Sequence, residues 1–317
     1  MPKITFPDGQ VKEFEKDISG KTIAESISNS LAKEAVAILV NGIQQDLCDL
    51  IKEDASISII TLKSSEGLEI MRHTLTAQVL ARAIKNIYPE AKLAIGPTIQ
   101  DGFYYDILFQ KPISTEDFPK IENEMEKIIT SGEKIQKIYK SKSEAIKLFK
   151  ERKENYKIQI IEESQQEKNF QIYQQGNSDF IDLCRGPHLP NLKLAGAFKL
   201  TKLSGAYWQG DSKNEMLQRI YGTAWRSQKE LEKYLLMLEE AKKRDHRKLG
   251  KDLNLFHFQD DAPGSVFWHP KGWTLYRLLM EYMRDKLEKA GYDEVNTPLM
   301  VDSSLWKDSG HWDKFRE

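Results

Sequence analysis

The most distinctive local sequence in this chain is Asp182-Leu183-Cys184-Arg185-Gly186-Pro187-His188. It places a carboxylate, a thiol and an imidazole within seven residues, and Gly186-Pro187 prevents a helical conformation there. Cys184 and His188 could bind zinc, or His188 could activate a water molecule with an acidic or basic side chain orienting it. A buried cysteine and a surface histidine in a turn are the ordinary alternative.

Two residues far from this segment could complete such a site. His73 could supply another ligand or a base, but at the start of a helix it could equally be a cap or a surface residue. Lys157 follows Tyr156 in the stretch 156–161, whose alternation predicts a strand. A solvated lysine is the simpler interpretation of that residue.

The N-terminal residues 1–62 alternate like a small α/β unit. Strands are predicted at 3–6, 11–14, 35–40 and 56–62, with a helix from Thr22 to Leu31 and a hairpin turn at Asn41-Gly42. A hairpin, a helix and further strands form a β-grasp pattern. Residues 64–67 then read as a short polar joint.

The region after this joint mixes helices and strands. Apolar residues at helical spacing predict a helix from His73 to Ile87, and residues 115–152 predict two charged helices. Residues 218–225 are rich in aromatics and contain Arg219, which could contact phosphate or bases, whereas Tyr221 and Trp225 fit core packing.

The C-terminal third begins with one long predicted helix, 227–251. Its last ten residues include six Lys or Arg, with Lys248 among them, and a solvated helix face is the default interpretation. A second amphipathic helix is predicted at 273–289 and a strand at 294–295. One helix, one strand and a loop cannot close a core, so we expect an unfinished domain here.

Composition limits the class of protein. The chain has 317 residues and a net charge of −1, which excludes a bulk-basic nucleic-acid binder but not a local basic surface. The two cysteines, Cys48 and Cys184, argue against a disulfide framework and fit a reducing cytosol. Neither a signal peptide nor an apolar stretch of membrane-spanning length is recognisable. We therefore expect a cytoplasmic protein that does not bind membranes.

Taken in order, these segments resemble the threonyl-tRNA synthetase family of class II synthetases. Residues 1–62 resemble its TGS domain, and residues 291–298 resemble motif 1, which builds the dimer interface. Six segments between them resemble parts of the family's editing domain: 71–73, 94–97, 101–106, 182–188, 205–208 and 219–225. Residues 244–250 resemble the bridge to its catalytic core.

The resemblance implies an α+β multidomain fold. The expected parts are a β-grasp TGS domain (1–62), an α+β editing domain (63–225), a helical linker (226–252) and the truncated start of a class II antiparallel-sheet core (253–317). The full-length family forms homodimers through motif 1.

The resemblance also implies a function. The full-length family attaches threonine to tRNA(Thr), and the part present here hydrolyses seryl-tRNA(Thr) made by mistake. The partner is the tRNA acceptor end carrying serine or threonine. The implied catalytic residues are His73, Lys157, Asp182, Cys184 and His188; the implied substrate-binding residues are Gly96, Tyr104 and Gln78; the implied tRNA-binding residues are Arg219 and Lys248.

One departure concerns the first editing helix, where the family carries a His-x-x-x-His pair. Position 77 is Ala77, and in a second register, with one extra residue near His73, the pair falls on Thr74 and Gln78. Loss of an imidazole also argues against bound zinc, so no metal is assigned to this site.

A second departure is the end of the chain at Glu317. ATP, Mg²⁺ and Zn²⁺ are expected only in the missing catalytic core, so ligation is not expected from this chain alone. Three hypotheses follow: a synthetase fragment that edits, a standalone deacylase acting in trans, or a non-catalytic tRNA-binding or regulatory module. Convergence of His73, Cys184 and His188 on one cleft would favour an enzyme; Gln78 and His73 pointing apart would favour the non-catalytic module.

Overall fold

The computed structural model describes residues 2–15, 17–298 and 300–314. The chain divides into two compact units, residues 1–235 and residues 236–317, which we describe separately. None of the helices in the described ranges is long and apolar enough to cross a membrane.

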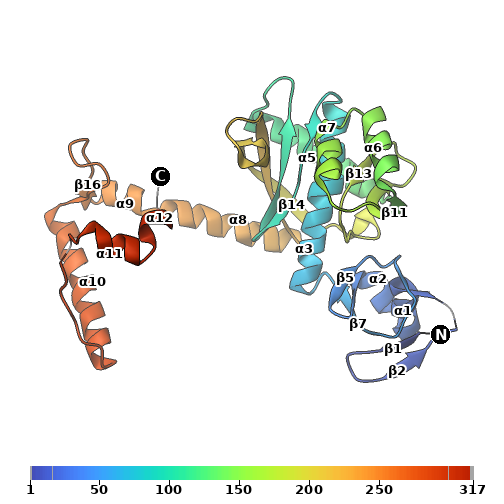
Figure 1. The fold of residues 1–317 in the computed structure, drawn as a ribbon, viewed down its shortest axis with the longest axis horizontal. Helices are drawn as coiled ribbons and strands as arrows, with labels where there is room; N and C mark the ends of the chain where they lie inside the picture. Colours follow the sequence, from blue (N-terminus) through green and yellow to red (C-terminus); the bar gives the residue numbers. More distant parts are fainter. Residues whose placement is uncertain (1, 16, 299, 315–317) are drawn as a thin grey trace. The chain divides into compact units, whose positions relative to one another are not determined.

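The first unit begins with the β-grasp domain that the sequence predicts (Figure 1). Its sheet has the order β2-β1-β7-β4-β5, with β1 and β7 parallel. Asn41 and Gly42 both adopt positive φ, as a tight hairpin turn requires. The predicted single helix is two helices, because Ser28 interrupts it and caps the second by accepting from the Leu31 N–H. The elements are β1 (Lys3–Thr5), β2 (Val11–Glu13), β3 (Ile18–Ser19), α1 (Gly20–Ile27), α2 (Asn29–Glu34), β4 (Ala35–Val40), β5 (Ile43–Gln45), β6 (Leu50–Ile51) and β7 (Ala55–Thr61).

A continuous helical segment follows and forms the axis of the next region. It consists of α3 (Ser65–Thr74), a π-helical stretch η1 (Leu75–Leu80) and α4 (Ala81–Ile87). The predicted polar joint at 64–67 was wrong, because Ser64 accepts from the Gly67 N–H and caps the helix here. His73 therefore lies inside the helix and does not cap it.

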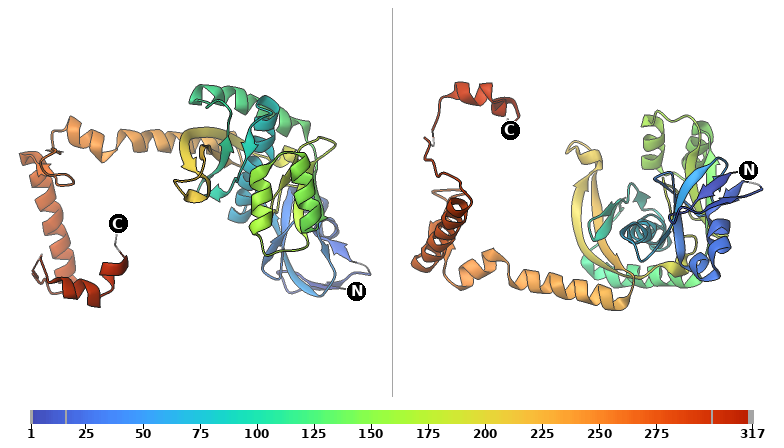
Figure 2. Two further views of the ribbon diagram at one scale, coloured as in Figure 1. Left: turned by 45° about the horizontal axis from the view of Figure 1, so that its top comes forward. Right: turned by 90° about the horizontal axis from the view of Figure 1, so that it is seen from below.

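Two sheets and several helices surround this axis (Figures 1 and 2). One sheet has the order β14-β15-β10-β8, with β9 also paired to β10; the other has the order β11-β12-β13. The strands are β8 (Lys92–Leu93), β9 (Thr98–Ile99), β10 (Gly102–Leu108), β11 (Ile135–Lys140), β12 (Phe170–Gln175), β13 (Ile181–Leu183), β14 (Ala197–Tyr207) and β15 (Met216–Trp225). The helices are η2 (Thr115–Asp117), α5 (Phe118–Ser131), α6 (Lys142–Glu151), α7 (Asn155–Glu163), η3 (Leu192–Leu194) and η4 (Trp208–Gly210).

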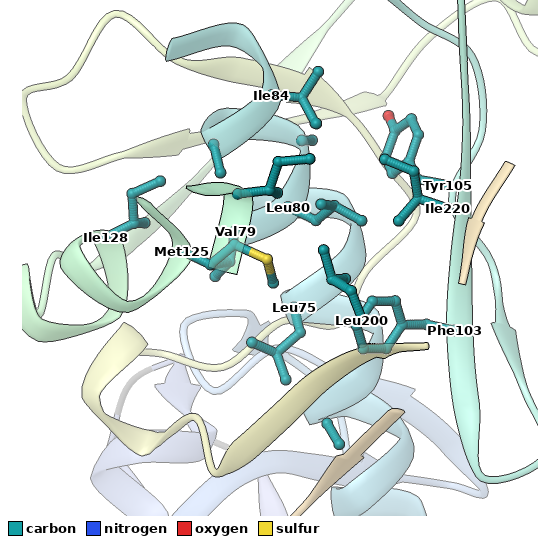
Figure 3. Close-up of a cluster of buried hydrophobic side chains, with 14 of the residues drawn as sticks. Leu75, Val79, Leu80, Ile84, Phe103, Tyr105, Met125, Ile128, Leu200 and Ile220 are labelled. Atoms are coloured by element: carbon teal, nitrogen blue, oxygen red, sulfur yellow. The ribbon is translucent and has the colours of Figure 1, made fainter. Parts of the chain in front are cut away.

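The core of this region lies between the axial helix, β10 and α5. Leu75 and Leu80 of the helix belong to one buried cluster with Phe103 of β10 and Met125 of α5 (Figure 3). These side chains are almost completely buried, and apolar burial of this kind is the main source of stability in a domain. The core therefore holds the axial helix and β10 rigidly, and both elements contribute to the site.

The stretch 156–161 forms helix α7, so the predicted strand was wrong. Its apolar residues also fit helical spacing, because Tyr156 and Ile160 are four residues apart and pack on the same small cluster. Lys157 and Ile161 are buried on a neighbouring face. A short apolar run can satisfy both periodicities, and tertiary packing selected the helix.

The second unit contains the end of α8 (Gln228–Lys243), which begins in the first unit, followed by α9 (His246–Asp252) and α10 (Pro270–Lys289). The predicted helix 227–251 is thus interrupted, and Asp245 caps α9 by accepting from the Arg247 N–H. The predicted strand at 294–295 is absent, since residues 292–298 form no regular element. The other elements are β16 (Phe256–His257), β17 (Phe267–Trp268), α11 (Ser303–Asp308) and α12 (His311–Lys314). The class II core stays a prediction.

Candidate active site

A cleft of about 840 Å³ opens beside the axial helix in the first unit. This volume lies within the range of about 300–1,000 Å³ that is typical of small-molecule sites. The axial helix, the segment before β10, helix α7 and the segment after β13 all contribute to its walls. Among the lining residues are His73, Ala77, Gly96, Pro97, Tyr105, Lys157, Asp182, Cys184 and Arg185.

His73 and Cys184 line this cleft, and His188 packs next to them. Their candidate ligand atoms all lie within 4.8 Å of one another. Cys184 Sγ is 3.0 Å from His73 Nε2, and the two imidazole rings have centroids 4.6 Å apart. Cys184, which lies 111 positions after His73 in the chain, and His188 are therefore brought into one cluster with it.

The His188 ring is buried, and one of its two nitrogens has a partner. The Thr74 hydroxyl donates to the Ile70 carbonyl, and its oxygen lies 3.3 Å from His188 Nδ1. His188 Nε2 has no hydrogen-bond partner among the described residues. A buried polar atom without a partner is uncommon in native proteins and is a candidate contact for a ligand or a water molecule.

His73 is the imidazole that lines the cleft. Burial lowers its pKa below the ordinary value because desolvation disfavours the charged ring, although a hydrogen bond to the backbone of Pro187 opposes this. The ring is therefore neutral near pH 7. Since Pro187 holds one ring nitrogen, Nε2 is the nitrogen that faces Cys184.

A buried group of three polar side chains lines the same cleft. Lys157 Nζ lies 2.7 Å from Asp182 Oδ1 and 3.1 Å from the Tyr105 hydroxyl, which donates to Asp182 Oδ2 at 3.2 Å. Lys157 and Asp182 are only 5% and 3% exposed. Burial raises the pKa of Asp182, and the neighbouring Lys157 opposes that rise. A buried ion pair with hydrogen bonds to a hydroxyl is stable where an isolated charge would not be.

The three residues at the cluster also fit the donor set of a catalytic zinc site, with one thiolate, two imidazoles and an open position. The position that could supply a fourth ligand is occupied by the methyl group of Ala77, which lines the cleft. The prediction that this site works without a metal stays a prediction.

Two of the three predicted substrate-binding residues lie elsewhere than expected. Gly96 does line the cleft, and a side chain there would collide with the Tyr105 ring, 2.3 Å from the added carbon. Tyr104 points to the other face of β10, because successive strand residues alternate, and its neighbour Tyr105 faces the cleft instead.

Gln78 does not reach the cleft. It is fully buried, and its side-chain and backbone oxygens accept from Gln175 Nε2. Ala77 takes the place at the cleft wall. Residues four apart lie on one face of a helix, so Ala77 follows His73 at the cleft wall while Gln78 faces Gln175.

The two predicted tRNA-binding residues differ in their surroundings. Arg219 pairs with Asp106 through two hydrogen bonds, at 2.6 and 2.8 Å, and its guanidinium covers the Tyr104 ring. Two of its five N–H donors are therefore occupied within the protein. Lys248 lies exposed on α9 in the second unit, and its contact with tRNA stays a prediction.

Sequence reasoning missed three residues at the site: Tyr105, Tyr173 and Asp46. The alternation of β10 could have identified Tyr105, because an aromatic at position 103 or 105 faces the core if 104 does not. The Tyr173 ring packs edge-on against His188 at 4.5 Å. Asp46 comes from the β-grasp domain, and nothing in the local sequence indicates that it would enter this region.

Comparison with known proteins gives consistent matches. Residues 2–61 match the TGS domain, and residues 171–221 match the threonyl and alanyl tRNA synthetase second additional domain. The threonine–tRNA ligases of Legionella pneumophila (strain Philadelphia 1), Rickettsia akari and Hahella chejuensis are 52%, 50% and 50% identical to this chain over 317 residues. These alignments cover 100% of this chain and 49% of each relative, so the chain spans about half the length of the curated relatives it matches.

Proposed function

We propose that this chain, which corresponds over its whole length to the N-terminal half of threonine–tRNA ligases, hydrolyses the ester bond of tRNA(Thr) mischarged with serine. The substrate would be the acceptor end of the tRNA, with its aminoacyl group in the cleft beside His73. Attachment of threonine, with ATP, Mg²⁺ and Zn²⁺, and dimerisation through residues 291–298 belong to the expectation for a full-length protein.

The chemistry of the two amino acids gives a reason for such a site. Serine lacks one methyl group of threonine, and a difference of that size supports only about 10- to 200-fold discrimination in binding. A synthetic site that accepts threonine cannot exclude the smaller serine by size. A second site that admits serine and hydrolyses its ester corrects the error.

In the proposed reaction, a water molecule attacks the carbonyl carbon of the aminoacyl ester. His73 Nε2 accepts one proton from that water, since its lowered pKa keeps the ring neutral near pH 7. Lys157 lines the same cleft and stabilises the negative charge that develops on the carbonyl oxygen. The carbon–oxygen bond to the ribose then breaks, and the ribose oxygen takes the proton from His73. The products are serine and uncharged tRNA.

The remaining residues position the reactants. His188 packs against His73, with ring centroids 4.6 Å apart, and orients that imidazole toward the water. Cys184 and Asp182 hold the amine or hydroxyl of serine, since thiol and carboxylate oxygen are both acceptors at the cleft wall.

The observation that carries this proposal is the cluster of His73, Cys184 and His188, because His73 and Cys184 line the cleft that contains the Lys157–Asp182 pair. A non-catalytic tRNA-binding module has no need of a buried lysine and a neutral imidazole in one cleft. Gln78 points to Gln175 and away from His73, and that observation alone favours the non-catalytic module, but the reaction above uses no atom of Gln78.

The test is deacylation of seryl-tRNA(Thr) by this chain, with threonyl-tRNA(Thr) as the control substrate and the His188→Ala variant as the blank. We expect rapid loss of serine only, reduced at least about 100-fold in the variant. Loss of serine at the rate of the blank would contradict the proposal and leave a tRNA-binding module.

A further inference from the structure

A short turn of the β-grasp domain reaches the candidate active site. In the turn 46–49, which follows β5, the Asp49 N–H donates to the Asp46 carbonyl at 3.0 Å, and the Asp46 N–H donates to the Asp49 carboxylate at 3.1 Å. Leu47, between them, is buried in the hydrophobic core of the β-grasp domain. The Asp46 backbone is thus fixed to one domain, while its side chain is available to the other.

The Asp46 carboxylate contacts three groups of the neighbouring domain. Its Oδ1 accepts from the His188 backbone N–H at 2.8 Å, and its Oδ2 accepts from the Tyr173 hydroxyl at 2.7 Å. Lys137 Nζ lies 3.0 Å from the same Oδ2. Asp46 is 5% exposed, and a carboxylate so deeply buried is tolerated only when donors of this kind surround it.

Lys137 compensates the negative charges of Asp46 and Asp49. Burial opposes the charge on Lys137, but Asp46 and Asp49 outweigh it and raise the pKa of Lys137 above its ordinary value. Lys137 also pairs with Asp49 at 2.7 Å. The carboxylate that holds His188 is therefore itself held by a charged lysine.

Gly186 shows how closely this network approaches the loop before His188. Its φ is +64°, and a side chain there would place a carbon 2.0 Å from the Tyr173 hydroxyl and 3.2 Å from Asp46 Oδ2. Tyr173 also packs edge-on against the His188 ring. Asp46 and Tyr173 therefore contact both the backbone and the ring of His188.

We propose that Asp46 is a positioning residue for His188, so that the β-grasp domain forms part of the deacylation site. Simple attachment of two domains would be achieved at lower cost by apolar contacts, because a buried carboxylate must recover its lost hydration. A satisfied buried polar network instead fixes one arrangement, and catalytic groups need such support from their neighbours. This inference rests on the proposed function.

The first test is kinetic, on the whole chain with seryl-tRNA(Thr). Asp46→Ala should lower kcat about 10- to 100-fold, with KM changed less than about twofold, because His188 is displaced but the cleft surface is unchanged. Asp46→Asn keeps an acceptor for the His188 N–H and should recover most of the loss. The matched control is Asp54→Ala, since Asp54 accepts only from the Lys3 N–H, within the same domain, and should leave kcat unchanged.

The second test monitors the backbone amide of His188 by NMR and does not depend on activity. Labelling with ¹⁵N-histidine gives six backbone amide signals for the six histidines, and the His188→Ala variant assigns one of them. In Asp46→Ala this signal should shift and its proton should exchange faster with solvent, while Asp54→Ala should leave it in place. If Asp46→Ala is unfolded at the assay temperature, Tyr173→Phe, which removes one donor to Asp46, serves as the test variant.

The outcomes separate the two proposals. Inactive wild-type protein with a shifted His188 amide in Asp46→Ala would reject the deacylase function but retain the link between the domains. Active wild-type protein with an unmoved amide and unchanged kcat in Asp46→Ala would overturn the positioning role.

Discussion

The two faces of strand β10 carry similar side chains with different surroundings. On one face, Tyr105 joins Lys157 and Asp182 at the cleft; on the other, Tyr104 joins Arg219 and Asp106. Both groups contain a tyrosine and an acid–base pair. Lys157 is 5% exposed, whereas Arg219 is 25% exposed.

The difference lies in what each group faces. Lys157, Tyr105 and Asp182 line the cleft, so their polar atoms can contact a bound ligand. Arg219 pairs with Asp106 through Nε and Nη2, and its flat surface covers Tyr104. These three side chains are not among the residues that line the cleft.

The largest expected effect comes from breaking the cleft pair. Lys157→Ala should abolish deacylation and lower the free energy of unfolding by about 3–5 kcal/mol, because it leaves the Asp182 carboxylate buried without its partner. Urea unfolding measures the second effect. The double variant Lys157→Met/Asp182→Leu should regain most of the stability and none of the activity; recovered activity would show that the pair is only structural.

The pH dependence of kcat should show that the base is a buried histidine, His73, and not an exposed one. Because burial lowers its pKa, His73 should stay neutral at pH 6.5, and kcat should fall about tenfold per unit only at lower pH. The unfolded chain binds this proton first, so His73 also makes stability fall as pH decreases below about 6.5. A fall in kcat that is centred above pH 7 would contradict this assignment. The residual kcat of His73→Ala should not show the fall at acidic pH.

The adjacent tyrosines provide a direct comparison of the two faces. Tyr105→Phe removes the hydroxyl that bridges Lys157 and Asp182, so it should lower kcat about tenfold and the free energy of unfolding by about 1 kcal/mol. Tyr104→Phe is the matched control and should change neither. Equal effects of the two substitutions on kcat would show that the faces do not differ in function.

A smaller effect is expected on the Tyr104 face of β10. Arg219→Lys loses the double hydrogen bond to Asp106 and should cost about 1 kcal/mol in urea unfolding. Deacylation should not change, because Arg219 is not among the residues that line the cleft, and tRNA binding should not change, because the substitution keeps the positive charge. Weaker tRNA binding at unchanged stability would restore the original prediction of a phosphate contact.

The smallest effect is expected from a chelator. Dialysis against EDTA should leave deacylation unchanged, because the proposed reaction uses only side chains of the cleft. Loss of activity that added Zn²⁺ restores would show that His73, Cys184 and His188 act as metal ligands.

Much of the architecture was predictable because it depends on local patterns. The β-grasp strands, the Asn41-Gly42 turn and the apolar stripe of the axial helix follow from periodicity and turn chemistry. The start of that helix was misplaced because Ser64 and Gly67 read as a joint, whereas they form its cap. Helix α7 was mistaken for a strand because five or six residues can fit both periods.

The sequence by itself determined the kinds of side chain that could react: His73, Lys157, Asp182, Cys184 and His188. It did so because reactive residue types in unusual segments, and a whole-chain family resemblance, are readable in one dimension. Only the tertiary structure decided that Tyr105 and not Tyr104 faces the cleft, that Gln78 is buried beside Gln175, and that Asp46 holds His188. These outcomes depend on strand orientation, helix register and contacts between residues up to 142 positions apart, which no local pattern encodes.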